Sequence, residues 1–160
     1  MNENEARKCS IIVFSGDMDR VMGAFIIATT AAAIGMDTSM FFTFWGLQAL
    51  KKKGVSTGKG FFGRMLSLFF KDIDGVGPSK LNMGGMGRWM FKKMMKAQNV
   101  ATLPELRQMA IDLGVHLLAC QMSMDVMEIP REALIDEVED VVGAATYVLN
   151  SQGADITLFV

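Results

Sequence analysis

The chain has 160 residues, of which 51% are hydrophobic and 21% are charged, and its formal net charge is −1. This length suits one domain with a real core. The mean hydropathy of +0.29 predicts more apolar surface than one core needs, so we expect a homo-oligomer or membrane contact. Two cysteines, Cys9 and Cys120, and one histidine argue against a disulfide framework and a zinc site. We expect no metal and no cofactor.

The N-terminal sequence and the charge distribution bear on location and organisation. Residues 1–8 lack the apolar region of a secretion signal, which favours a cytoplasmic protein. The longest apolar stretch, 21–36, is shorter than the roughly 20 residues of a membrane span, so it predicts a buried helix. Residues 51–98 hold eleven Lys or Arg against two Asp, a net charge of +9, and the remainder carries −10. Such a split is typical of an inserted segment with its own partner or task.

The first quarter of the chain alternates between strand and helix patterns. Residues 10–14 (SIIVF) predict a buried strand, and Asp17 or Asp19 can cap the helix that follows it. Residues 38–44 (TSMFFTF) predict a second strand, and residues 45–53 a short helix that ends in three lysines. A β-α-β-α order is typical of a parallel sheet.

The alternation breaks over residues 55–98, which are rich in glycine, methionine and lysine. Two amphipathic helices are expected near 60–70 and 86–97, joined by a mobile glycine-rich link over 75–87. We interpret the whole segment as a separable lid or docking arm that can reach the sheet edge of Cys120, rather than as part of the core.

The alternation resumes at Thr102, an N-cap followed by Pro104 and Glu105. The expected elements are a helix to about 113, a strand over 115–119, a helix over 123–127, a turn over 131–134, a strand over 137–142, a helix over 143–152 and a strand over 155–160. The sequence therefore predicts one α/β domain over 1–160. It has a five-stranded, mainly parallel sheet with helices on both faces, and the helical basic insertion lies between strands two and three.

Cys120 is the candidate catalytic residue. It ends the third strand at the carboxyl edge of the sheet, where open parallel sheets bind ligands, and it precedes a helix whose N–H groups favour the reactive thiolate. The alternative is a small buried residue at a strand end. Cys9 lies at the opposite edge and is interpreted as structural. His116 is four residues from Cys120 on one strand, about 13 Å away, so it is interpreted as structural rather than as the base of a dyad.

Other residues are expected to meet Cys120 at the carboxyl edge. They are Asp17, Met18, Trp45, Met122, Ser123 and Met124. A pocket made from them would be apolar and rich in sulfur, and no glycine loop of the chain predicts a phosphate site. Asp17 remains ambiguous, since it can face the thiolate or cap the first helix.

Four stretches of the sequence carry a family resemblance. SIIVFSGDMDRVMGAF, TFWGLQALKKKG, GMGRWMFKKMMKAQNVATLPELRQMA and ACQMSMDVMEIPREALIDEVEDVVGAATYVL resemble the DsrE/DsrF/DsrH-like family, whose relatives include the Tus sulfur-relay subunits. The insertion is similar to that of the long-insert branch. The resemblance implies a five-stranded α/β fold, homo- or hetero-oligomers, and a persulfide on Cys120. It also implies a sulfurtransferase-like relay between donor and acceptor proteins or low-molecular-weight persulfides.

The competing hypothesis is a non-catalytic interaction module. In that case the basic amphipathic insertion would dock a membrane surface or a partner protein. A simpler alternative has both helices packing on the sheet or on neighbouring subunits with their lysines in water. Nucleic acid is not expected as a partner, because the rest of the chain is acidic and no recognition motif is present.

Overall fold

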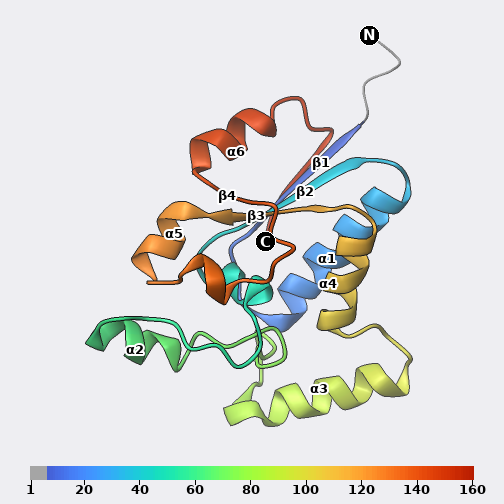
Figure 1. Cartoon of the computed structure of the whole chain (residues 1–160). Coiled ribbons are helices and arrows are strands. Elements are labelled where there is room, and N and C mark those ends of the chain that lie inside the picture. Colours follow the sequence, from blue (N-terminus) through green and yellow to red (C-terminus); the bar gives the residue numbers. More distant parts are fainter. Residues whose placement is uncertain (1–6) are drawn as a thin grey trace.

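The structure, a computed structural model, describes residues 7–160 (Figure 1). Its five strands form one all-parallel sheet in the order β4-β3-β2-β1-β5, which confirms the predicted fold class. The strands are β1 (Lys8–Val13), β2 (Asp37–Phe42), β3 (His116–Cys120), β4 (Asp140–Val142) and β5 (Ile156–Phe159). Most of the segment 1–8, on which the expected location was based, lies outside the described residues.

The helices cover the two faces of the sheet unequally. The α-helices are α1 (Met18–Ala33), α2 (Phe61–Ser67), α3 (Met86–Ala97), α4 (Leu103–Asp112), α5 (Gln121–Val126) and α6 (Ala144–Asn150). The 3-10 helices are η1 (Phe44–Leu50), η2 (Met83–Gly85) and η3 (Arg131–Ala133). Helices α1 and α4 lie under one face, and the shorter α6 lies over the other (Figure 1). No helix in the described part of the chain is long and apolar enough to cross a bilayer.

Several predicted elements differ from those observed, among them the strand over 137–142, of which only Asp140–Val142 is a strand. The strand over 38–44 ends at Phe42, because Phe44 takes a left-handed conformation with φ 48° that cannot continue a strand. The helix over 45–53 is the 3-10 helix η1, and Lys51 after it forms a β-bridge to Leu134. The helix after β3, α5, begins at Gln121 rather than at residue 123, so no loop separates it from β3.

The sheet separates a large core from a small one. The large core lies on the α1 and α4 face and includes Phe25, Met40 and Phe42, all fully buried. The small cluster lies on the other face and consists of Phe41, Leu118, Cys120 and Tyr147, with Ile12 and Val142 packed against it. Because successive side chains of a strand alternate between faces, neighbours such as Phe41 and Phe42 enter different cores.

Part of the insertion belongs to the large core. Phe70, Ile73, Val76 and Met95 are each at most 7% exposed and pack in the large cluster. The prediction that 55–98 is wholly separable from the core is therefore wrong for this part. The physical reason is that these four apolar side chains pack in the large core on the α1 and α4 face. The charge and glycine content of the segment do not predict this burial.

Polar bonds fasten the same part of the insertion to the body. The buried Lys51 ammonium donates to the Phe70 carbonyl at 2.7 Å and lies over the Phe70 ring. The Met18 N–H donates to the Gly77 carbonyl, and Ser79 donates from its N–H and its hydroxyl to the Asp19 carboxylate. The segment 70–79 is thus bonded across the start of α1.

His116 serves as a link at the amino edge of the sheet. Its imidazole contacts Glu139, just before β4, and Asp37, at the start of β2, with the Nε2 to Asp37 Oδ1 distance at 3.2 Å. The hydrogen bond to Glu139 raises the pKa of His116 above its ordinary value. Burial opposes this shift, and the two carboxylate charges add to it. This edge is remote along β3 from Cys120, so His116 does not form a dyad with the thiol.

We predict that Phe70→Ala lowers the free energy of unfolding by about 3 to 5 kcal/mol, because it leaves a cavity in the large core. The matched control is Phe69→Ala, whose side chain is 67% exposed and whose cost should stay within about 0.5 kcal/mol. Denaturant titration of both variants provides the measurement. Equal stabilities would show that the insertion is not part of the core.

We predict that His116→Gln flattens the dependence of stability on pH. A raised folded pKa means that protonated His116 contributes its full stability below its unfolded pKa of about 6.5. This contribution is lost as the pH rises through the folded value. Since the imidazole is nearly half exposed, the effect should stay below about 1 kcal/mol. Unfolding titrations across this range test it, and parallel profiles for the two proteins would contradict it.

Candidate functional site

Cys120 is the last residue of β3 and the residue immediately before α5. It pairs with Val142 of β4, and Ala119 before it pairs with Phe42 of β2. The thiol therefore lies at the carboxyl edge of the sheet, as the sequence predicts. Its side chain makes no capping hydrogen bond to α5, and only 2% of the residue is exposed. The position fits a ligand-binding edge, but the thiol is covered.

Helix α6 contributes one buried side chain, Tyr147, to the small cluster that contains Cys120. The ring of Tyr147 stacks on Phe41 with centroids 4.4 Å apart and an interplanar angle of 11°. Its hydroxyl is hydrogen-bonded to Ser10 on β1, and Ser10 is also bonded to Ser151 at 2.8 Å. Tyr147 and Cys120 belong to the same small cluster. The buried thiol thus shares its apolar cluster with Tyr147, the buried side chain of α6.

A buried hydroxyl pair fixes the position of α5. The Thr43 and Ser123 hydroxyl oxygens are 2.7 Å apart, and Ser123 is fully buried. Thr43 follows β2 directly, so the bond joins the end of that strand to the helix that begins after Cys120. Ser123 is a predicted site residue and Thr43 is not. No local sequence pattern marks Thr43, because its contact with Ser123 depends on the pairing of Phe42 with Ala119 between distant strands.

Two predicted residues line a cavity of about 400 Å³ beyond the end of β1. Its lining consists of Phe14, Ser15, Gly16, Asp17, Arg20, Trp45 and Gln48. The Asp17 carboxylate lies 3.7 Å from Arg20 Nε and makes no side-chain capping bond, although Asp17 occupies the N-cap position of α1. The capping role considered for this carboxylate is therefore not observed. Cys120 is not among the lining residues, so cavity and thiol are separate features of one edge.

The three predicted methionines lie in different places. Met122 is 58% exposed on α5, whereas Met18 and Met124 are buried in the large core cluster. The small cluster around Cys120 includes none of the three. Of the three methionines, only Met122 lies at the surface, and Met18 and Met124 pack in the large core.

An aromatic surface at the same edge was missed by the sequence interpretation. Phe14 lies between Phe44 and Phe159, with ring centroids 5.4 Å and 5.9 Å apart. Phe14 is 41% exposed and Phe159 is 69% exposed. Ile12 of the small cluster pairs with Phe159, so Phe14 and Phe159 share the face of Cys120. The sequence signal was the strand predicted over 10–14, because Ile12 and Phe14 fall on the same face of a strand.

The second cysteine has different surroundings. Cys9 lies near the start of β1, at the opposite edge of the sheet, inside the large core. Burial raises the pKa of the Cys9 thiol, which disfavours its reactive form. Both cysteines are free. Among residues 7–160 no group of three or more His, Cys, Asp or Glu side chains is arranged to hold a metal ion.

Comparison with known proteins identifies the family of this chain. The model of the DsrE/DsrF/DrsH-like family matches residues 5–159. The chain is 40% identical to the Bacillus subtilis protein YrkE over 161 residues, and 37% identical to the sulfur carrier protein DsrE2 of Allochromatium vinosum over 159 residues. Each alignment covers at least 98% of both chains. The crystal structure of YchN from E. coli has a TM-score of 0.55 at 12% identity, covering 96% of this chain and 99% of that one, which shows likeness of fold alone. The chain therefore belongs to the DsrE/DsrF/DrsH-like family.

Proposed function

We propose that this protein is a sulfurtransferase-like sulfur carrier that relays sulfane sulfur as a persulfide on Cys120. The observation that carries the proposal is a thiol at the carboxyl edge of the parallel sheet in a chain that is 37% identical, over nearly its full length, to a protein named a sulfur carrier. Family membership supports sulfur relay in general. The assignment to Cys120 rests on its position at the carboxyl edge and on the place of Cys9 in the large core at the opposite edge.

The transfer is a thiol exchange. The Cys120 thiolate attacks the outer sulfur of a donor persulfide, and a new S–S bond forms to Cys120. The S–S bond of the donor breaks, and the donor leaves as a thiolate with the electron pair of that bond. In the second step an acceptor thiolate attacks the outer sulfur on Cys120 and restores the Cys120 thiolate. No external oxidant or reductant is needed.

The covered position of Cys120 gives the relay two states. With Tyr147 on Phe41 the thiol is shielded, and with α6 displaced the thiol faces a partner. The exposed aromatic surface of Phe14 and Phe159 lies on the same face and is available for contact. The partners proposed are sulfur donor and acceptor proteins or low-molecular-weight persulfides, in the cytoplasm.

We also propose a homo-oligomer, since α6 and β5 leave apolar side chains in water. Val148 and Leu149 on α6 are 59% and 63% exposed, and Phe159 on β5 is more exposed still. A second candidate function, docking through the insertion, is favoured by the exposed apolar side chains of α2 and α3. It is compatible with sulfur relay, because the two roles use different surfaces.

We predict that incubation with a sulfane-sulfur donor adds one sulfur atom, about 32 Da, to the intact protein. The adduct should map to Cys120 and be absent from Cys120→Ala. Cys9→Ala is the matched control and should retain the adduct, because Cys9 lies in the core at the opposite edge. Mass spectrometry of intact protein and peptides provides the measurement. An adduct that persists in Cys120→Ala and maps to Cys9 would refute the site assignment.

We predict that Tyr147→Ala raises the alkylation rate of Cys120 by about tenfold, because it removes the stacking and the hydrogen bond that hold α6 down. Tyr147→Phe keeps the ring and should have a smaller effect. Peptide mapping after limiting iodoacetamide reports both cysteines of one sample, so buried Cys9 is the internal control. Equal acceleration at Cys9 and Cys120 would indicate global unfolding and contradict a local cover.

A further inference from the structure

The outer surface of α2 is apolar and unpartnered within the described residues. Phe61 and Phe62 are 79% and 76% exposed, and their rings pack edge to face 5.6 Å apart. Leu68 and Phe69 just after the helix are 76% and 67% exposed. The only buried residue of α2 is Gly63, where the helix meets the body. The helix thus uses its glycine for packing and directs its large side chains into solvent.

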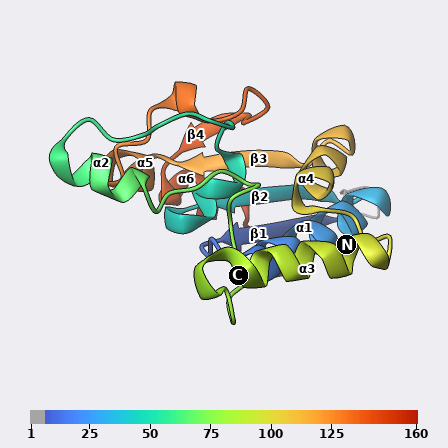
Figure 2. The same ribbon diagram turned by 90° about the horizontal axis from the view of Figure 1, so that it is seen from below.

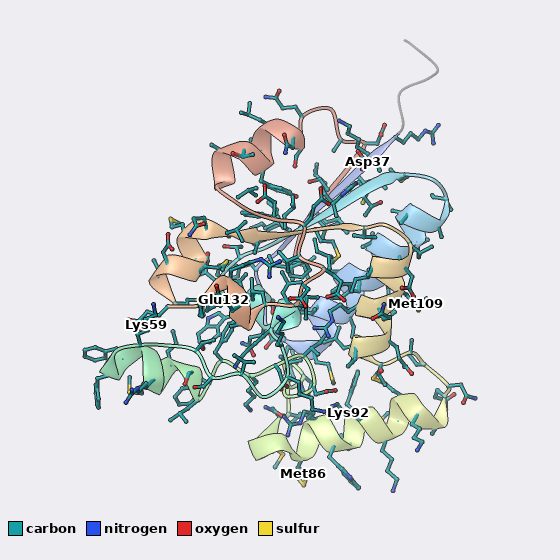
Figure 3. The ribbon with its side chains drawn as sticks, viewed as in Figure 1. Asp37, Lys59, Met86, Lys92, Met109 and Glu132 are labelled. Carbon is teal, nitrogen blue, oxygen red and sulfur yellow. The ribbon has the colours of Figure 1, made fainter. Side chains whose placement is uncertain are left out.

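Helix α3 has the same arrangement. Gly87 and Met95 are buried on its inner side, whereas Met86 and Trp89 are 58% and 63% exposed. The view from below shows α3 uncovered by other elements (Figure 2). The view with side chains shows Met86 on the outer side of the helix and Lys92 on the side turned to the body (Figure 3). Both helices therefore present apolar side chains on the outside of the insertion.

The inward cations hold α3 in place. Lys92 donates to the Asp74 carbonyl and lies 4.0 Å from the Asp74 carboxylate, and Arg88 donates to the Gly75 carbonyl. Residues 74 and 75 adjoin Ile73 and Val76, which are buried in the large core. The outward face of α3 is thus carried on a segment anchored in the body.

Exposed cations flank the apolar side chains. Arg64, Lys93 and Lys96 are exposed on the two helices, and neither helix contains an acidic residue. The Lys93 ammonium lies 5.1 Å from the centroid of the Trp89 ring. Aromatic, methionine and basic side chains together are typical of helices that lie in a membrane interface.

We infer that α2 and α3 form a docking surface for an anionic phospholipid bilayer. Phe61, Phe62 and Trp89 enter the boundary between headgroups and acyl chains, and the exposed cations Arg64, Lys93 and Lys96 contact lipid phosphates. Charge complementarity selects this occupant. Residues 51–98 carry +9 and the rest of the chain −10, so an anionic surface attracts the insertion and repels the body. This segregation also sets the orientation of the protein on the membrane.

The docking surface lies beside the edge of Cys120. Glu128, two residues after α5, accepts hydrogen bonds from the N–H groups of Lys59 and Gly60 at the start of α2, and the Gly58 N–H donates to its carbonyl. Figures 1 and 2 both place α2 next to α5. A protein bound through α2 and α3 therefore holds the α5 end of the sheet near the bilayer.

The experiment is co-sedimentation with vesicles of phosphatidylglycerol and phosphatidylcholine, and of phosphatidylcholine alone. Binding is expected to the anionic vesicles and to fall as salt increases. Phe62→Ser with Trp89→Ser should weaken it by about tenfold or more. The control pair is Ile34→Ser with Leu113→Ser, which removes apolar side chains that are 73% and 43% exposed after α1 and α4 and should leave binding unchanged. Circular dichroism verifies that both pairs are folded.

Three results would overturn the inference. They are no binding to anionic vesicles, equal binding to both vesicle types, and equal loss in the two serine pairs. If the Phe62 and Trp89 pair changes the particle mass in light scattering while vesicle binding is unchanged, the surface is an interface between copies. The persulfide measurement on Cys120 needs no vesicles, so sulfur relay and membrane docking fail independently.

Discussion

The alternation of side chains along β3 and β2 governs the site. Ala119 enters the large core, and Cys120, one residue later, belongs to the small cluster on the other face. That face is covered by the short helix α6, whereas α1 and α4 cover the other face (Figure 1). A one-residue shift of register would exchange the two cores and bury the thiol under two helices. The register of this sheet therefore decides whether the thiol can be uncovered at modest cost.

Tyr147 has two roles in α6: its ring packs in the small cluster, and its hydroxyl bonds to the sheet. Its ring completes the small cluster over Phe41, and its hydroxyl reaches Ser10 on the neighbouring strand. The remaining outward residues of α6, such as Val148 and Leu149, are exposed. A helix fastened mainly through one side chain opens locally more easily than one that shares a wide apolar face with the sheet. The short helix α6 can therefore pack Tyr147 in the cluster of Cys120 and still open locally.

The insertion joins core and surface in one segment. Its middle residues, Phe70, Ile73 and Val76, are packed as tightly as the strands, and buried Lys51 bonds to the Phe70 carbonyl. Burial lowers the pKa of Lys51, and the carbonyl satisfies the ammonium that the fold encloses. The helices on either side carry the exposed apolar and basic residues. Because this middle part is buried and hydrogen-bonded to the body, it connects the two helices to the core.

The sequence by itself determined the order of elements, the parallel sheet, the two insertion helices and the place of Cys120 at a carboxyl edge. These follow from local periodicity, capping residues such as Thr102 and glycines at helix ends, all of which act within a few residues. Tertiary structure alone decided that Met18 and Met124 pack in the large core, that Thr43 meets Ser123, and that Phe70 completes the core. It also decided that Tyr147 of α6 joins Cys120 in the small cluster. Each of these depends on contacts between segments far apart in the chain, which strand register and helix docking create and which no local pattern records.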